Sequence, residues 1–378
     1  MVPMQPRSPV EVHRASTPLE LLFDLVFVVA VALASARLHH GIVENHVGHA
    51  IVSFVMVFFP IWWAWMNFSW FASAYDTDDV PYRLLTMLQL AGALTLAAGV
   101  PSAFETQDFL VSTLGYVLMR IALVLQWSRA WRADPPRRKV IARYIIGLIL
   151  AQSGWLALLV LPPSIKMIGF ITLATLELFI PYWAESAGQS TPWHPEHIVE
   201  RYGLFTIIVL GESILSASMA IQAAMKAGAL DAKMLYLIAG GVLIVFSMWW
   251  SYFQQVEHKI TESMRNLFFW GYGHFFIFAS AAAVGAGIAA SVDAALGLTQ
   301  ASQQVTNAAI ALPAAIFSLS LGLVHGRLRQ AGPVRKAFCL MMLAIVSTIW
   351  LDSAVFWIGV SMATYLGFKL AVNRSITV

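Results

Sequence analysis

The side chains in this sequence with the greatest capacity for chemistry are ionisable groups inside long apolar stretches. Glu212 and Glu177 each lie near the centre of such a stretch, and so do Arg120 and His274. A charged side chain at membrane depth costs about 2.5–3.5 kcal/mol on insertion scales, so each of these groups needs a partner or a water-filled cavity. The chemistry open to them is proton binding, proton relay or passage of a small ion.

The central positions hold two carboxylates and one guanidinium, so the single positive charge balances only one of the two acids. If Arg120 pairs with Glu177 or with Glu212, one acid is left over, and an unpaired acid at that depth is expected to respond to protons. Ser213 beside Glu212, and Gln89 in another apolar stretch, could extend a polar path. The alternative is that the ion pair only holds helices together and that the second acid is protonated and hydrogen-bonded.

Two further groups lie at the beginnings of apolar stretches. Glu20 and Asp24 are one helical turn apart and therefore share a face of the first stretch. His194, His197 and Glu200 precede the seventh stretch with a spacing that could bring them to one metal ion. Pro195 is typical of the first residue of a helix, which favours helix capping at this motif instead. Metal binding there is left open.

The composition indicates a membrane protein. Hydrophobic residues make up 59% of the 378 residues, charged residues 11%, and the mean hydropathy is +0.72, whereas a soluble domain carries about 25% charged residues. These values exclude a soluble enzyme and a disordered chain. The net charge of +3 gives no reason to expect a nucleic-acid partner. The single cysteine, Cys339, excludes an intrachain disulfide, and we expect no cofactor because no cofactor-binding motif is present.

The apolar runs predict an all-α protein with about twelve transmembrane helices. The predicted spans are 19–38, 48–72, 83–104, 109–130, 139–161, 165–184, 200–222, 233–256, 264–289, 306–326, 335–351 and 353–372. With the N-terminus inside, 18 Lys and Arg residues fall on the inner side and four on the outer side. Lys and Arg favour cytoplasmic loops, so both termini, in tails 1–18 and 373–378, are predicted to be cytoplasmic.

The two halves of the sequence are similar to each other. The segment that starts at Glu20 in the first half aligns with the segment that starts at Glu200 in the second. Likewise, Trp62-Trp63-Ala64-Trp65 aligns with Trp249-Trp250-Ser251-Tyr252. We therefore expect two six-helix repeats, 19–184 and 200–372, joined by a cytoplasmic linker, 185–199. Because six is even, both repeats insert the same way up, as parallel repeats with a functional path between them.

Three blocks of sequence are distinctive: Glu20-Leu-Leu-Phe-Asp-Leu-Val-Phe27, Trp62-Trp-Ala-Trp65 with Asp76-Thr-Asp-Asp79, and His194-Pro-Glu-His-Ile-Val-Glu-Arg-Tyr-Gly-Leu-Phe-Thr-Ile-Ile-Val-Leu-Gly-Glu-Ser213. In these blocks the chain resembles the bacterial low temperature requirement A (LtrA) family, over roughly residues 18 to 370. The resemblance implies a polytopic inner-membrane protein named after a growth phenotype. It also marks Glu20, Asp24, Glu200 and Glu212 as motif acids, with His194 and His197 alongside.

A weaker similarity is to the two-repeat lysosomal potassium/proton channel family. Phe23-Asp24-Leu25-Val26-Phe27 is similar to the aromatic–acid–aromatic signature in the first helix of that family, although the family's serine is missing. The second half has Leu204 where the acid would stand. The sequence therefore departs from the pattern expected of a symmetric pore of that kind.

These observations favour a proton-linked transporter or a cation/proton channel of the bacterial inner membrane. Glu20 and Asp24 would form a cytoplasmic mouth and Glu212 the central protonatable group, with Glu177, Arg120 and His274 as its partners. The expected partners are the lipid bilayer and a proton or small cation. The alternatives are an intramembrane enzyme acting on lipid-like substrates through His194, His197 and Glu200, and a sensor or assembly factor that transports nothing. Substrate, direction of coupling and oligomeric state are left open.

Overall fold

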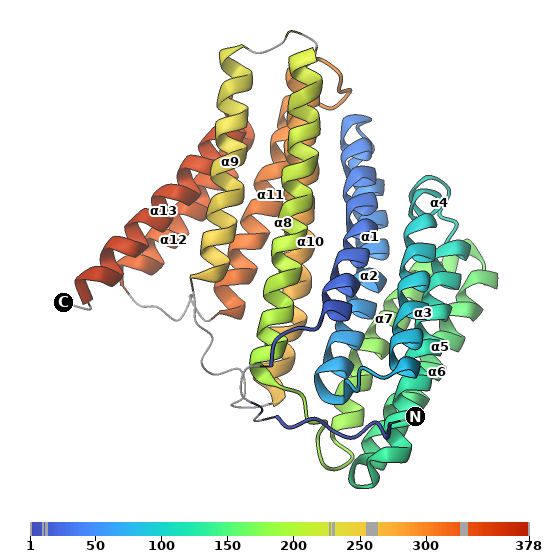
Figure 1. The fold of residues 1–378 in the computed structure, drawn as a ribbon. Helices are drawn as coiled ribbons and strands as arrows, with labels where there is room; N and C mark the ends of the chain where they lie inside the picture. Colours follow the sequence, from blue (N-terminus) through green and yellow to red (C-terminus); the bar gives the residue numbers. More distant parts are fainter. Residues whose placement is uncertain are drawn as a thin grey trace. The chain divides into compact units, whose positions relative to one another are not determined.

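The computed structural model describes residues 2–9, 11, 14–226, 228, 231–254, 264–325 and 332–376, with the backbone alone for 373–376. Within these residues the chain is helical and contains no strand (Figure 1). Twelve helical segments of the described chain are long and apolar enough to cross a membrane, which confirms the predicted fold class. Lys259, Arg327 and Arg329, which contributed to the predicted charge bias, lie outside the described residues.

Each predicted span overlaps one of these segments. Their bounds are α1 Pro18–Val43, α2 Val47–Tyr75, α3 Val80–Ala98 with α4 Val100–Glu105, α5 Leu110–Ala133, η1 Pro135–Arg137 with α6 Arg138–Val160, α7 Pro163–Glu185, α8 Pro195–Lys226, α9 Ala232–Phe253, α10 Met264–Ala295, α11 Gln303–Val324, α12 Pro333–Ser347 with η3 Thr348–Trp350, and α13 Ala354–Ile376.

Several helices extend beyond the predicted spans. α8 begins at Pro195, one turn before the predicted start at 200, and α10 continues to Ala295 instead of 289. α13 runs to Ile376, through four residues of the predicted tail 373–378. Hydropathy marks the part of a helix that matches the hydrocarbon core, whereas backbone hydrogen bonding continues wherever the local residues allow it. The helices are therefore longer than their apolar cores.

The chain divides into two compact units. Unit 1 comprises Met1–Leu33 and Val55–Leu204, and unit 2 comprises Ala34–Phe54 and Phe205–Val378. The boundaries between the units fall inside α1, α2 and α8. This division differs from the predicted repeats 19–184 and 200–372 with linker 185–199, and the two-repeat arrangement stays a prediction.

The core of unit 1 is aromatic. α2 supplies most of its fully buried large side chains, and the Phe23 ring of α1 stacks on Phe68 of α2 with ring centroids 3.9 Å apart. The largest fully buried side chains of this core include Trp62, Trp63, Trp65, Phe58, Phe68, Phe71, Tyr75, Tyr82 and Tyr202. Indole and phenol groups buried in this way need hydrogen-bond acceptors. The core of unit 1 therefore surrounds its buried carboxylates with donors.

Unit 2 is built around α10, whose long run of alanine and glycine is buried. A Cβ at Gly285 would lie 2.8 Å from the Ser213 hydroxyl, and one at Gly287 would lie 2.5 Å from the Ala309 carbonyl oxygen. Small residues at these positions let α8 and α11 approach α10 closely, as expected for helix packing in a membrane.

Candidate functional site

The N-terminus of α1 is fixed by a reciprocal capping interaction. Thr17 precedes the helix, and its hydroxyl accepts a hydrogen bond from the Glu20 amide at 3.3 Å. The Glu20 carboxylate in turn accepts from the Thr17 amide at 2.8 Å. This is the capping box that Thr-x-x-Glu sequences form. It holds Glu20 at the first turn of α1 and leaves its other carboxylate oxygen, Oε1, for other partners.

The beginning of α8 is also capped. His194 precedes Pro195, and its Nδ1 accepts a long hydrogen bond of 3.4 Å from the His197 amide. Its Nε2 lies 2.8 Å from the Glu11 carbonyl oxygen, which can only accept, so Nε2 carries the proton. His194 is therefore a capping residue of α8. α8 begins at Pro195, five residues before the predicted span 200–222, and the His194 side chain lies at its first turn.

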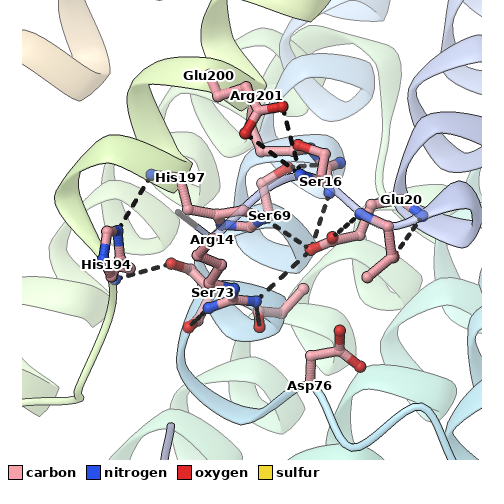
Figure 2. A network of polar contacts seen from close by, with 12 residues as sticks. Arg14, Ser16, Glu20, Ser69, Ser73, Asp76, His194, His197, Glu200 and Arg201 are labelled. Carbon is pink, nitrogen blue, oxygen red and sulfur yellow. Dashed lines mark hydrogen bonds and ion pairs between the residues drawn. The ribbon is translucent and has the colours of Figure 1, made fainter. Parts of the chain in front are cut away.

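α1 and α8 meet through buried charges, which Figure 2 shows from close by. Arg201 lies one turn after His197 in α8. Its guanidinium contacts Glu20 Oε1 at 3.3 Å and Asp24 Oδ1 at 2.5 Å. The His197 Nε2 lies 3.2 Å from the same Glu20 oxygen. All four residues are 0% exposed. Two carboxylates, one guanidinium and one imidazole therefore share a site without contact with solvent.

α2 completes one side of this site. The Trp65 indole donates to Asp24 Oδ1 at 2.6 Å, and the Arg201 guanidinium lies 3.3 Å from the Ser69 hydroxyl, to which it donates. Asp24 Oδ1 thus receives two donors, one from α2 and one from α8. Three helices, α1, α2 and α8, position the acids and their partners.

The segment before α1 contributes a second arginine. Arg14, only 6% exposed, donates to the backbone carbonyls of Ala72 and Ser73 in the last turn of α2. Its guanidinium also lies 3.9 Å from Glu20. A cation at a helix C-terminus interacts favourably with the helix dipole and with the carbonyls that lack helical partners. We call Arg14, Glu20, Asp24, His197 and Arg201 the charged cluster.

Asp76, directly after α2, is the titratable group at the edge of the charged cluster. It lies 3.7 Å from Arg7 and accepts a hydrogen bond from the Asp78 amide at 2.9 Å. Burial raises the pKa of Asp76 to about 6, and the negative charge of Glu20 adds to this effect. Burial also lowers the pKa of Arg14, against the opposing effect of Glu20. Asp76 is therefore a group that changes charge near neutral pH beside the charged cluster.

Several polar atoms of the charged cluster have no hydrogen-bond partner among the described residues. They include Oδ2 of Asp24, Oε1 of Glu20, both ring nitrogens of His197, and Nε and Nη1 of Arg201. Some of these atoms lie within ion-pair distance of each other, but not in hydrogen-bond geometry. Orphaned buried polar atoms are rare in proteins and mark strain or function. Each carboxylate therefore has one oxygen that no hydrogen bond occupies.

A second buried ion pair lies elsewhere in unit 1. Arg120 of α5 contacts Glu177 of α7 at 2.8 Å. Of the two acids considered as its partner, Glu177 and Glu212, the structure therefore pairs it with Glu177. The same carboxylate accepts from Tyr116 at 3.1 Å, from Trp155 at 3.0 Å and from the indole of Trp63. Both charged residues are buried. The carboxylate of this pair is saturated with donors, in contrast to those of the charged cluster.

The other predicted site residues have separate environments. Gln89 donates to Gln126 at 2.7 Å in unit 1. In unit 2, Glu212 is half-buried and accepts from Ser216 at 3.1 Å, while Ser213 donates to the Ala281 carbonyl. His274 of the same unit is fully buried, with Nδ1 2.7 Å from the Trp270 carbonyl oxygen and Nε2 3.1 Å from the Tyr252 hydroxyl.

The three residues considered for a metal site face different partners. His194 faces the Glu11 carbonyl, His197 faces Glu20, and the Glu200 carboxylate accepts from the Ser16 amide at 3.2 and 3.3 Å. In the part of the chain that the structure describes, no three His, Cys, Asp or Glu side chains are grouped as metal ligands. The geometry at this motif therefore fits helix capping and charge pairing better than metal binding.

Sequence reasoning missed Arg201, Arg14 and Trp65 as members of this site. A span predicted to begin at residue 200 puts Arg201 at the membrane edge, among the charges that set orientation. A helix that begins at Pro195 instead puts Arg201 four residues after His197 on the same face. That signal was present in the sequence. Arg14 carried none, because its contacts depend on how the segment before α1 packs against α2.

A comparison with protein-family models identifies one family. The model of the family described as "Bacterial low temperature requirement A protein (LtrA)" matches residues 15–370. A curated relative from Rhizobium meliloti (strain 1021), described as "Uncharacterized protein RA0937", is 26% identical over 261 residues. The alignment covers 67% of this chain and 61% of the relative, so the chain matches less than two thirds of the relative's length. No solved structure gives a significant match.

Proposed function

Because the chain belongs to the bacterial low temperature requirement A family, and has twelve apolar helices among its described residues, we propose that it is a proton-linked transporter or a cation/proton channel. The proposed location is the bacterial inner membrane, with both termini in the cytoplasm. The proposed proton-accepting site is the charged cluster between the first turns of α1 and α8.

The observation that carries this proposal is the burial of Glu20 and Asp24. Both are 0% exposed, and both face Arg201, which is 0% exposed as well. Ionisable groups inside membrane helices are costly and commonly mark ion pathways and proton relays. A role in packing alone would be served by an apolar contact, which is often as stable as a buried ion pair.

The geometry suggests how a proton would act. A proton on Asp24 or Glu20 neutralises the carboxylate and weakens its attraction to the Arg201 guanidinium. The link between α1 and α8 then loosens, and loss of the proton restores it. His197 Nε2, 3.2 Å from Glu20 Oε1, is close enough to pass a proton to that oxygen or to take it back. The charged cluster is thus a protonation-controlled contact between two helices.

Other predicted residues take secondary roles in this proposal. Glu212 is a second protonatable group, 11 residues after Arg201 in α8, with Ser213 beside it, and His274 is a candidate relay group in unit 2. Arg120 and Glu177 hold α5 and α7 together, because the Glu177 carboxylate is already saturated. Gln89 joins α3 to α5 through Gln126.

The proposal is tested by ion flux into liposomes that contain the purified protein and an internal pH dye. A pH gradient is imposed, with and without K⁺ or Na⁺ gradients. We expect proton flux with the wild type and about a tenfold or greater loss with Asp24→Asn and with Glu20→Gln, because removing one partner of a buried pair costs several kcal/mol. Folding of each variant is checked by size-exclusion chromatography and circular dichroism.

Two control variants sharpen this test. Glu196→Gln changes an exposed acid one residue before His197, and it should leave flux unchanged. Glu177→Gln changes the acid of the second buried pair and should reduce stability more than flux. If the folded wild type conducts no ion under any gradient, the transport proposal is wrong and the sensor or assembly role is favoured. If flux persists in both cluster variants, the charged cluster is not the proton site.

A further inference from the structure

One end of α5, α6 and α7 in unit 1 carries an unusual density of positive charge. Between residues 129 and 143 there are six basic residues and one acid. The acid, Asp134, is 2% exposed and is bound by Tyr75 and Arg137, so it does not offset the charge of the surface. The basic residues are Arg129, Arg132, Arg137, Arg138, Lys139 and Arg143. At the opposite end of α7, Lys166 is the only basic residue.

Arg138 is held in place by a tryptophan at this end. Its Nε donates to the Trp131 carbonyl at 3.1 Å, and its guanidinium carbon lies 5.0 Å from the centroid of the Trp131 ring. Trp131 is itself 40% exposed. A guanidinium fixed in this way loses less side-chain freedom when it binds an anion, and it presents paired donors that match a phosphate.

Arg143 repeats this arrangement with α7. Its Nη1 donates to the Trp183 carbonyl at 2.6 Å, and its guanidinium carbon lies 5.1 Å from the centroid of the Trp183 ring. Trp183 is near the end of α7, next to Tyr182, which is 57% exposed. Tryptophan and tyrosine favour the headgroup level of a bilayer. Two stacked arginines therefore lie beside residue types that favour the headgroup level.

Two neighbouring cations have exposed side chains for which the structure shows no acidic partner among the described residues. Arg132 and Lys139 are both exposed. The nearby acid Glu185 is engaged by the Tyr144 hydroxyl and by Thr191. The surface formed by Arg132, Arg138, Lys139 and Arg143 therefore keeps its net positive charge. We call it the basic surface.

We propose that the basic surface binds the phosphate groups of anionic phospholipids in the adjoining leaflet. The apolar sides of the same helices favour a lipid over a free anion, because Ile146, Leu150 and Phe179 are exposed at 48%, 61% and 53%. One ligand with a phosphate headgroup and acyl chains matches both features. Basic surfaces beside membrane helices are attracted to anionic lipids by about 1 kcal/mol per Lys or Arg. This inference does not depend on the proposed transport function.

The inference is tested by native mass spectrometry of the purified full-length protein in detergent, titrated with phosphatidylglycerol or with phosphatidylcholine. We expect the wild type to prefer phosphatidylglycerol. Arg132→Gln combined with Lys139→Gln should raise the Kd for phosphatidylglycerol about tenfold to thirtyfold. These two exposed residues are chosen because their replacement leaves both arginine–tryptophan contacts and the fold intact. Arg138→Gln should raise the Kd as well.

A matched double variant tests whether location matters. Lys166→Gln combined with Lys233→Gln removes the same charge from sites outside the basic surface and should leave the Kd unchanged. Equal binding of phosphatidylcholine, or an unchanged Kd in the Arg132 and Lys139 variant, would overturn the inference. Displacement of phosphatidylglycerol by millimolar inorganic phosphate would overturn it too, because the surface would then be a site for free anions.

Discussion

Glu20 and Glu177 are both buried carboxylates beside an arginine, but their surroundings differ. Glu177 accepts from Arg120, Tyr116, Trp155 and Trp63, so its charge is fully compensated. Glu20 Oε1 has the guanidinium groups of Arg14 and Arg201 and the His197 Nε2 within 3.9 Å, and it has no hydrogen bond among the described residues. A carboxylate whose oxygens all accept hydrogen bonds is a structural anchor, whereas an oxygen without a hydrogen bond is open to a further partner. This contrast is why the charged cluster, and not the second pair, is the proposed proton site.

Asp76 leads to a prediction on the pH dependence of stability. Its pKa is about 6 in the folded protein and 3.8 as the ordinary value. Between these values the folded protein keeps a proton that the unfolded chain has released, so the free energy of unfolding falls as pH rises through that range and stays lower above it. Asp76→Asn removes the titrating carboxyl group and with it this decrease in the free energy of unfolding. The Tm of the variant relative to wild type should therefore increase as pH is raised from about 4.5 to about 7.

The thermal unfolding of both proteins in detergent at several pH values measures this difference. The groups that face Asp76, namely Arg7, Arg14, Glu20 and Tyr82, are present in both proteins, so their effects largely cancel. Asp78→Asn is the neighbouring control. The hydrogen bonds that Asp78 accepts from Arg83 lower its pKa below the ordinary value. Asp78 therefore does not change the pH dependence of the free energy of unfolding between about pH 4.5 and about pH 7. Parallel curves for wild type and Asp76→Asn would contradict the prediction.

For single residues, the sequence predicted burial better than it predicted the contacts that each buried side chain makes. The depth of Glu177 and Arg120 followed from their place in apolar runs, and charge alone limited Arg120 to two acids. The hydrogen bonds from Trp63 and Trp155 could not be predicted, because they depend on how α2, α5, α6 and α7 are rotated against each other. The same holds for Trp65 and Asp24.

Helix ends decide where the charges of unit 1 meet. α1 begins with a capping box at Thr17, α8 begins after the His194 cap, and α2 ends against the Arg14 guanidinium. Because the first turns of α1 and α8 and the last turn of α2 lie together, Glu20, His197 and Arg14 reach the same place. The apolar runs located the twelve membrane-length helical segments of the described chain, since hydropathy depends on composition alone. They misplaced the start of α8, since capping depends on single residues at the helix end.

Arg14 is expected to lock the segment before α1 onto α2. Arg14→Gln removes charged hydrogen bonds to the Ala72 and Ser73 carbonyls and one cation near Glu20. We expect a loss of about 1–3 kcal/mol in the free energy of unfolding, since these bonds come from a charged donor. Faster hydrogen exchange is expected at the Ser16 amide, which donates to Glu200. Denaturant unfolding and exchange mass spectrometry measure the two effects.

Arg14→Lys and Arg83→Gln provide the comparison for this prediction. Lysine keeps the charge but lacks the paired donors of arginine, so Arg14→Lys should give an intermediate loss. Arg83 forms an ion pair with Asp78 in which both side chains are about half exposed, and exposed pairs contribute little. An Arg14→Gln variant as stable as Arg83→Gln, with unchanged exchange at Ser16, would show that the segment is held by other contacts.

The two halves of the molecule use similar sequences in different surroundings. Trp62 and Trp63 are 1% exposed in the core of unit 1, whereas Trp249 and Trp250 are 48% and 47% exposed in unit 2. Matching sequence in the second helix of each half therefore does not lead to matching burial. Sequence similarity can predict that two halves share a pattern of helices, but not which face of each helix is covered. The predicted repeat symmetry has to be tested through membrane topology.

Topology follows from counting crossings. Glu44 lies between α1 and α2, Ser190 between α7 and α8, and Asp352 between η3 and α13. With twelve spans, five crossings separate Glu44 from Ser190 and ten separate Glu44 from Asp352. Glu44 and Asp352 should therefore be on one side of the membrane and Ser190 on the other. From the charge bias of the sequence we predict that Ser190 lies on the cytoplasmic side.

Single introduced cysteines can show on which side of the membrane each of these positions lies. Cys339 is the only cysteine and is exposed, so Cys339→Ser gives a background without thiols. Glu44→Cys and Asp352→Cys should react with an impermeant maleimide in intact spheroplasts, whereas Ser190→Cys should react only after the membrane is permeabilised. If Glu44→Cys and Asp352→Cys react from opposite sides, an odd number of helices separates them. Two six-helix repeats that insert the same way up would then be ruled out, because each repeat must return the chain to the side where it began.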